Sequence, residues 1–333
     1  MIVQFAGLLV AISSFSSIQL FVGSAVQVNS FEGAAFFMAY ILVTAAIILL
    51  IMKFYHGNLV YLLLESLVVL FASTFLFFMV LNDIFQSAAW YYIAAASAIA
   101  ALSLIIAKSR MPRLRNLIAI TSSIGVGVVI GLNGFALAYI LTLFIAAYDY
   151  IAVFITKHMV TMAKEISSRN LAFLIGSTDV EAMPSKYLSK SEVLEFKKQE
   201  KSHRISDPAL KGLMNEGIMP IISQVQLGTG DLAIPLMVAV SAYISFINYI
   251  IPVAVVIGST CGLVFTMYLL KRYKVVLPAI PPIFAFVNLS LGIVFAATGT
   301  GTLVQSIGFI IISIFTLAIL MLRLNGGAKV RKP

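Results

Sequence analysis

The chain has 333 residues, of which 61% are hydrophobic and only 11% are charged, and its mean hydropathy is +1.05. A soluble domain has about 45–50% apolar and about 25% charged residues, so this composition excludes a water-soluble globular protein. The single cysteine, Cys261, excludes a disulfide scaffold and a CxxC motif, and three scattered histidines exclude a histidine-based metal centre. The net charge of +9 would favour nucleic-acid binding in a soluble protein, but in a bilayer the position of each charge matters more. We therefore expect a lipid bilayer around the chain, and neither a nucleic-acid partner nor a metal.

Ten apolar stretches are long enough to cross a bilayer. A spanning helix needs about 20 residues, so ten of them occupy about 60% of a chain of this length. The sequence therefore predicts an all-α polytopic membrane protein built as a bundle of ten transmembrane helices. Gly125, Gly127 and Gly131 in the fifth stretch predict close helix packing rather than a nucleotide-binding loop. The ten predicted ranges are 2–22, 34–52, 59–81, 87–107, 114–131, 135–156, 221–248, 252–270, 280–298 and 303–322.

The basic residues are distributed on one side of these predicted spans. When the connecting segments are placed alternately on the two sides of the membrane, all 22 Lys and Arg residues fall on the side of Met1. The positive-inside rule makes that side cytoplasmic. We therefore expect a multi-pass protein of the cell membrane with both termini inside. Because no basic segment precedes the first span, we interpret it as a retained helix rather than a signal peptide.

One long segment is too polar to span the membrane. Residues 157–220 hold ten basic and eight acidic residues. Ser191 followed by Glu192 predicts an N-capped surface helix, and Asp207-Pro208 predicts a turn. Both a flexible linker and a regulatory or substrate-gating segment fit this composition. The expected division of the chain is five N-terminal helices (1–134), a sixth helix (135–157), a cytoplasmic polar loop (158–220) and four C-terminal helices (221–333).

Three carboxylic acids lie within the predicted spans, where an unpaired charge costs several kcal/mol. With a rise of about 1.5 Å per residue, Asp149 lies about 12 Å and Asp231 about 15 Å from the cytoplasmic ends of consecutive spans. Two carboxyl groups at one level in an apolar medium hold one proton between them. The ionised one can then activate a water while the protonated one hydrogen-bonds the carbonyl under attack, a hydrolysis that needs no metal or cofactor. For Glu65 we expect an interhelical hydrogen bond in its protonated form.

The residues around the two aspartates support a site in the cytoplasmic third of the membrane. Asp231 follows Leu227-Gly228-Thr229-Gly230, whose glycines allow a neighbouring helix or an extended substrate to approach the backbone. Asp149 follows Tyr148, whose hydroxyl suits the edge of a polar site in an apolar wall. Pro278-Ala279-Ile280 opens the ninth span, and two further prolines after it withhold backbone donors.

Together these segments resemble a known family. Tyr148-Asp149, Gly228-Thr229-Gly230-Asp231 and Pro278-Ala279-Ile280 are similar to the three motifs of the presenilin and signal peptide peptidase family of intramembrane aspartyl proteases. The resemblance covers about residues 135–290 and includes the order of the motifs and the long loop between the first two. It suggests a microbial homologue outside both named branches.

The resemblance implies a presenilin-like bundle with nine family-like helices, a tenth C-terminal one, and no cofactor. It implies that Asp149 and Asp231 form the catalytic dyad and that Pro278-Ala279-Ile280 shapes the site and engages substrate. The implied substrates are transmembrane segments or remnant signal peptides, cleaved near their cytoplasmic ends. Ile280 stands where the family has leucine, a conservative apolar change. Residues 221–226 would offer an edge strand to an extended substrate.

Two other functions are consistent with parts of this pattern. Ten spans with both termini inside also describe a secondary transporter of two five-helix repeats. Such a transporter predicts a boundary after the fifth span, whereas this chain has its long loop after the sixth, and no counterpart of residues 228–231 occurs in the first half. A catalytically inactive chaperone or scaffold leaves both aspartates unexplained. A second Pro-Ala-Leu, at residues 208–210, lies in the polar loop and is treated as coincidence.

Overall fold

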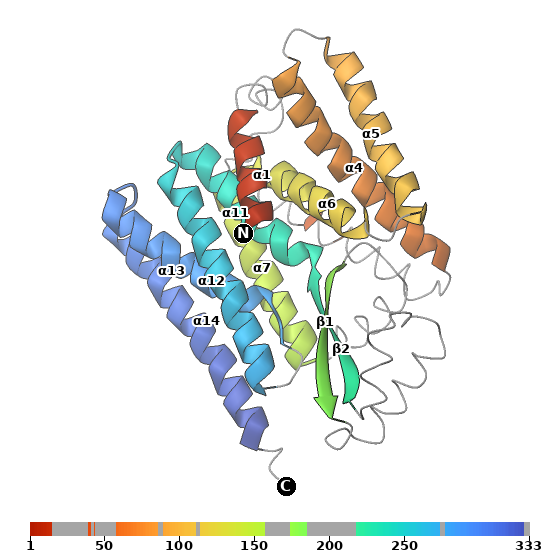
Figure 1. Ribbon diagram of the computed structural model, residues 1–333. Coiled ribbons are helices and arrows are strands. Elements are labelled where there is room, and N and C mark those ends of the chain that lie inside the picture. Colours follow the sequence, from red (N-terminus) through yellow and green to blue (C-terminus); the bar gives the residue numbers. More distant parts are fainter. Residues whose placement is uncertain are drawn as a thin grey trace. The chain divides into compact units, whose positions relative to one another are not determined.

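The computed structural model describes residues 1–14, 39–40, 43, 58–85, 89–110, 114–156, 174–184, 218–273 and 277–329. Four predicted segments lie wholly or largely outside these ranges: most of the second span, the end of the first span from residue 15, the surface helix at 191–198, and residues 207–210. The elements with defined bounds in the described ranges are labelled in Figure 1 and are α1 (Ile2–Ser13), α4 (Asn58–Ile84), α5 (Trp90–Arg110), α6 (Leu114–Gly131), α7 (Phe135–Phe154), β1 (Leu174–Pro184), β2 (Ile218–Gly228), α11 (Thr229–Phe246), α12 (Ile250–Tyr273), α13 (Ile280–Thr298) and α14 (Leu303–Lys329).

The helices agree with most of the predicted spans. Helices α6 and α13 have the predicted bounds, and α5 and α12 begin and end within three residues of theirs. Over the described residues, seven helices are long and apolar enough to cross a membrane, while α1 and α6 contain shorter apolar stretches. The prediction of a multi-pass helical membrane protein is confirmed. The count of ten spans stays a prediction, because most of the predicted second span lies outside the described residues.

The prediction for the seventh span is wrong at its beginning. Residues 221–228 belong to strand β2, and helix α11 begins only at Thr229. Polar and apolar residues alternate from Gln224 to Leu227, which favours a strand, and the glycines at 228 and 230 disfavour an earlier helix. Asp231 is therefore the third residue of its helix, and the depth estimated from a start at residue 221 does not apply.

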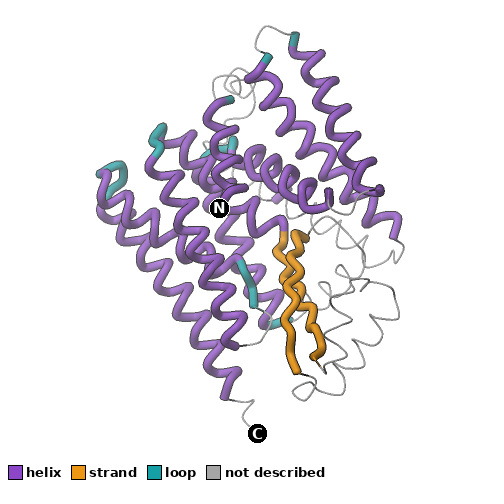
Figure 2. Tube along the Cα trace, viewed as in Figure 1, coloured by secondary structure: helices purple, strands orange, loops and turns teal. Residues whose placement is uncertain are grey.

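Strands β1 and β2 form a two-stranded sheet, drawn in orange in Figure 2. Residues 175–227 make up a compact unit of their own, separate from the unit of helices formed by residues 1–174 and 228–333. The all-α prediction thus holds for the helical unit but not for the sheet. Of the sheet, the sequence predicts only an edge strand at residues 221–226.

Helix α11 lies at the centre of the helical unit. It packs against α1, α6, α7, α12 and α13. Every residue from Pro235 to Tyr243 is buried. A helix that is buried on all sides is surrounded by other helices, so its apolar surface is withdrawn from lipid. The third residue of this central helix is Asp231.

Glycines allow α6 to approach α11 closely. A β-carbon added at Gly127 would lie 2.8 Å from the Ala233 carbonyl oxygen, and one at Gly131 would lie 2.8 Å from that of Met237. A β-carbon at Gly125 would overlap the Ala72 carbonyl group of α4. The expected packing role of these three glycines is confirmed, and this packing fixes the position of α11.

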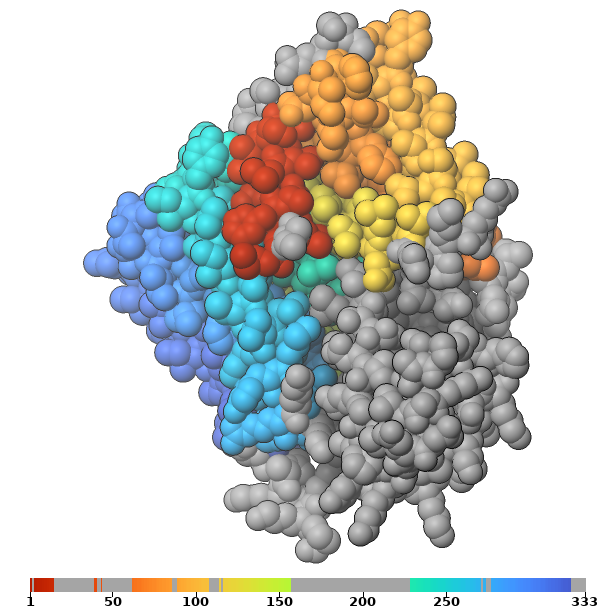
Figure 3. Space-filling view, in the orientation of Figure 1, coloured from red at the N-terminus to blue at the C-terminus, as the bar shows by residue number. Residues whose placement is uncertain are grey.

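Helix α1 covers part of the same core. Leu8 and Ala11 are buried in it. The buried Oε1 of Gln4 accepts a hydrogen bond from Ser259 Oγ of α12 at 3.2 Å. Figure 3 shows α1, in red, at the surface of the helical unit between α4 and the C-terminal helices. The contact gives the buried amide oxygen of Gln4 a donor within apolar surroundings.

Candidate active site

Asp149 lies near the end of α7, and its side chain is only 3% exposed. Its Oδ2 accepts a hydrogen bond from the backbone N–H of Ile280 at 3.1 Å, and the backbone of Ala279 also bonds to the carboxylate. Ile280 is the first residue of α13, where backbone N–H groups have no partner inside the helix and favour negative charge. The Pro-Ala-Ile segment therefore holds the Asp149 carboxylate through its backbone.

The second oxygen of Asp149 has a different environment. Oδ1 is buried and has no hydrogen-bond partner among the described residues. A buried polar oxygen without a partner costs about 1–3 kcal/mol, so native proteins keep such groups mainly where they have a function. One oxygen of Asp149 is therefore anchored, and the other is available to a reacting group.

Asp231 occupies the first turn of α11. Its Oδ2 accepts a hydrogen bond from the backbone N–H of Gly228 at 3.3 Å, which ties the carboxyl group to the start of the helix. A β-carbon at Gly228 would lie 3.3 Å from the same oxygen, so glycine leaves room for this carboxyl group. At Gly230 an added β-carbon would meet nothing within 4 Å in the described part of the chain, so the space there is open.

Pro235 affects the backbone beside Asp231. It lies inside α11, four residues after Asp231. Because proline has no N–H, α11 cannot form the helical hydrogen bond that would end on the Asp231 carbonyl oxygen. The carbonyl oxygen of Asp231 therefore accepts no hydrogen bond from residue 235 of its own helix.

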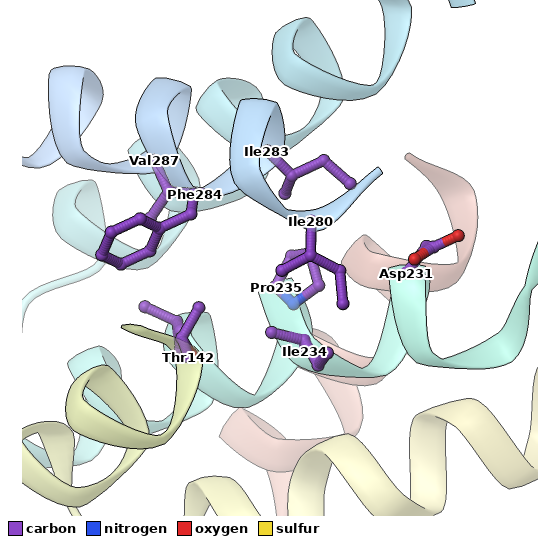
Figure 4. A pocket seen from close by; sticks show the side chains of 9 residues that line it. Thr142, Asp231, Ile234, Pro235, Ile280, Ile283, Phe284 and Val287 are labelled. Carbon is purple, nitrogen blue, oxygen red and sulfur yellow. The ribbon is translucent and has the colours of Figure 1, made fainter. Parts of the chain in front are cut away.

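Asp149 and Asp231 interact electrostatically, and Ile280, whose N–H binds Asp149, lines the same cavity as Asp231. Beside Asp231 is a small cavity of about 10 Å³, the lower limit for one water molecule. In Figure 4, Ile280 lies next to Ile234 and Pro235, and the Asp231 carboxyl group points away from these apolar side chains. The cavity is lined from α7, α11 and α13 by Thr142, Asp231, Ile234, Pro235, Val238, Ile280, Ile283, Phe284 and Val287.

The other predicted site residues lie in different surroundings. Pro278 and Ile280 are buried, and Ala279 and Thr229 are partly buried. Tyr148 is 54% exposed although its neighbour Asp149 is buried, because consecutive residues of a helix face different directions. A role for the Tyr148 hydroxyl stays a prediction, and the side chain of Leu227 is not among those described. Glu65 is buried in α4 and does not line the cavity.

A polar pair that the sequence analysis did not identify links two of the helices that line the cavity. The hydroxyl of Tyr139 in α7 donates to Asn288 Oδ1 in α13 at 2.6 Å, and Asn288 Nδ2 donates to the Phe284 carbonyl oxygen at 2.8 Å. Asn288 is the single amide side chain in the mainly apolar helix α13, and an isolated amide in such a helix is a signal for an interhelical hydrogen bond. Thr142, seven residues before Asp149 on the same face of α7, was also missed. Among the described residues, no three His, Cys, Asp or Glu side chains lie together as a metal site requires.

Comparisons with known proteins show the family and the fold. The family model described as signal-peptide peptidase, presenilin aspartyl protease matches residues 1–297. Two solved structures of a presenilin family intramembrane aspartate protease, in space groups C222 and P2, are similar in fold. The C222 structure has a TM-score of 0.52 and is 16% identical, and the match covers 87% of this chain and 92% of that chain. The P2 structure has a TM-score of 0.55 and is 17% identical, and the match covers 90% of this chain and 97% of that chain. The comparison with curated proteins found no match. The chain therefore belongs to the signal-peptide peptidase and presenilin family of aspartyl proteases, and it is an intramembrane aspartic endopeptidase.

Proposed function

We propose that Asp149 and Asp231 are the catalytic dyad of this protease. The observation that carries the proposal is the environment of Asp149, whose carboxyl group is buried in an apolar bundle beside a second carboxyl group. One of its oxygens is held by the N-terminus of α13, and the other has no partner in the described part of the chain. Groups that are buried, anchored on one side and chemically unused on the other are typical of active sites.

The proposed reaction is the hydrolysis of a peptide bond by water. The two carboxyl groups share one proton, because two adjacent negative charges in an apolar site are unfavourable. The ionised group takes a proton from water as the water oxygen bonds to the carbonyl carbon. The protonated group donates its hydrogen to the carbonyl oxygen. When the tetrahedral intermediate collapses, the carbon–nitrogen bond breaks and a proton goes to the leaving nitrogen.

The proposed substrates are transmembrane segments or remnant signal peptides. A helical substrate bonds its own backbone groups, so it must unwind locally before water reaches a peptide carbonyl. Residues 221–226, in the strand that precedes Asp231 in the chain, would pair with the extended substrate. The one-sided distribution of the basic residues supports cytoplasmic termini and a cytoplasmic polar segment, and hence cleavage near the cytoplasmic end of the substrate.

Cleavage of a reporter transmembrane peptide in liposomes tests the dyad. Asp149→Asn and Asp231→Asn keep the size of each side chain and remove its acid function. We expect each to lower kcat by about 10²–10⁴-fold. Asp83→Asn, the same change near the end of α4, is the matched control and keeps the wild-type rate. A dyad variant that cleaves as fast as the wild type contradicts the proposal.

A second measurement separates the protease from the secondary transporter. A peptide isostere with a hydroxyl group in place of the scissile carbonyl mimics the tetrahedral intermediate, and such mimics bind far more tightly than substrate. We expect it to block cleavage by the wild type and to bind weakly to both dyad variants. A transporter forms no such intermediate, and a scaffold cleaves nothing.

A further inference from the structure

Helix α14 lies beyond the part of the chain that matches the family model, which ends at residue 297. It nevertheless packs along the whole of α13, and Figure 1 shows the two helices side by side. A β-carbon added at Gly292 of α13 would lie 2.9 Å from the Ser306 carbonyl oxygen, so the two backbones approach closely. The polar residues Ser306 and Ser313 of α14 are buried. Helix α14 is thus an integral part of the bundle.

The first half of α14 contacts α7 as well as α13. The ring of Phe309 meets the ring of Tyr139 in α7 edge to face, with centroids 5.4 Å apart. Ile312 packs against the cluster formed by Ala146 of α7 with Ile280 and Phe284 of α13. The helix therefore covers the line of contact between α7, which carries Asp149, and α13, which begins with the Pro-Ala-Ile segment.

The second half of α14 contacts the residues that flank both partners of the Asp149–Ile280 hydrogen bond. Leu320 and Leu324 form a buried cluster with Leu269 of α12 and with Leu277, the residue directly before Pro278, and Phe154 packs against the same cluster. Phe154 ends α7, five residues after Asp149. These contacts join the end of α7 to the start of the Pro-Ala-Ile segment.

A charged contact adds to this cluster. Arg323 Nη2 donates to the Phe154 carbonyl oxygen at 3.5 Å. The last carbonyl groups of a helix have no partner inside the helix, and a cation near them is favourable. Arg323 therefore attaches α14 to the C-terminal turn of α7.

We propose that α14 positions the active site by holding the end of α7 and Leu277 in a fixed relation. This inference rests on the proposed function. The hydrogen bond from Ile280 to Asp149 joins two separate elements. Pro281 and Pro282, in the first turn of α13, supply no backbone N–H to anchor that turn, so its position depends on side-chain packing. Catalytic groups must be held within about 0.5 Å of their productive geometry, and α14 supplies the packing that does so.

A matched pair of leucines on α14 tests this role in the full chain. Leu320 is 0% exposed and Leu322 is 74% exposed, so the same substitution removes packing at one position only. We expect Leu320→Ala to lower kcat in the reporter assay by about 10- to 100-fold at unchanged KM, because misplacement of about 1 Å can cost about 10²-fold. It should weaken binding of the hydroxyl isostere by the same factor. Leu322→Ala keeps wild-type kcat and isostere affinity.

A third variant separates positioning from a general loss of stability. Ile118, 1% exposed, lies in the buried cluster with Val69, between α6 and α4. Ile118→Ala is expected to lower Tm as Leu320→Ala does but to keep kcat in the folded enzyme. If Leu320→Ala and Ile118→Ala lose the same Tm and also the same kcat, the inference is overturned. Full activity of Leu320→Ala overturns it as well. Leu320→Met, which conserves volume, should restore most of the activity.

Arg323 provides a test that does not depend on a core substitution. Its side chain is exposed, so Arg323→Ala is not expected to prevent folding. We expect a fall in kcat of about 3- to 10-fold, smaller with Arg323→Lys, which keeps the cation near the helix end. Unchanged kcat in Arg323→Ala, with a wild type that still cleaves, overturns the part of the inference that rests on the Arg323 contact. A wild type that cleaves no substrate overturns the proposed function, and this inference with it.

Discussion

The backbone nitrogen of Ile280 lies 3.1 Å from Oδ2 of Asp149, and this hydrogen bond joins the start of α13 to the end of α7. Sequence motifs identify the Pro-Ala-Ile segment and the aspartate separately, but only this contact explains how one acts on the other. The part of Ile280 that matters for the aspartate is its N–H, which every amino acid except proline supplies. The leucine that the family has at this position would make the same bond.

The first prediction concerns the donor at residue 280. Ile280→Pro removes the N–H and should lower kcat by about 10- to 100-fold, since a hydrogen bond to a charged group contributes about 1.5–3 kcal/mol. Ile280→Leu keeps both the donor and the volume, and should stay within about threefold of the wild type. Ile280→Ala keeps the donor and removes the side chain, and it controls for packing. The prediction is wrong if the proline and alanine variants have equal kcat at equal folded fraction.

The second prediction concerns the turn before Asp231. Gly228→Ala places a methyl group 3.3 Å from Asp231 Oδ2 and 3.7 Å from its Cγ, so the carboxyl group must shift by a few tenths of an ångström. We expect a lower kcat with a small change in Tm. Gly230→Ala adds the same methyl group where no described atom lies within 4 Å, so it should leave Tm unchanged and act, if at all, on KM through the substrate. Equal kcat for Gly228→Ala and the wild type would contradict this account of Gly228.

The third prediction concerns the Tyr139–Asn288 pair. Tyr139→Phe leaves a buried amide oxygen without its 2.6 Å donor, and the variant should lose about 1–3 kcal/mol of stability. Asn288→Leu removes the partner, and the double variant should lose less than the sum of the two single changes. Thermal unfolding in detergent measures the series. Tyr148→Phe, on an exposed side chain of the same helix, should leave Tm unchanged, so any fall in its activity reports a direct role of that hydroxyl.

The fourth prediction concerns the contact between α4 and α6. Gly125→Ala places a methyl group on the Ala72 carbonyl, so the helices must move apart, at a cost of about 1–3 kcal/mol. Gly308→Ala makes the same change on α14, where a β-carbon meets no described atom within 4 Å, and should be neutral or slightly stabilising. The yield of folded protein and its Tm distinguish the two variants. Equal Tm for both would show that the close approach at Gly125 is not required for packing.

Properties that depend on local composition can be predicted from the amino-acid sequence. Membrane helices are recognised by runs of apolar residues, so the bounds of α6 and α13 agree with prediction. Charges inside such runs are rare, so Asp149, Asp231 and Glu65 could be identified without coordinates. The flanking motifs then indicated the family, because their order along the chain is itself a sequence property.

Properties that depend on contacts between distant residues follow from the tertiary structure. It began α11 at Thr229 rather than at 221, and it directed the Ile280 N–H toward Asp149, more than a hundred residues earlier in the chain. It separated the buried Asp149 from the exposed Tyr148, and it placed α14 against both α7 and α13. Hydropathy measures how much a side chain prefers lipid or protein over water, but it does not specify which helix faces which. That choice depends on the fit between helix surfaces, such as Gly131 against the Met237 carbonyl oxygen, which exists only once the helices have packed.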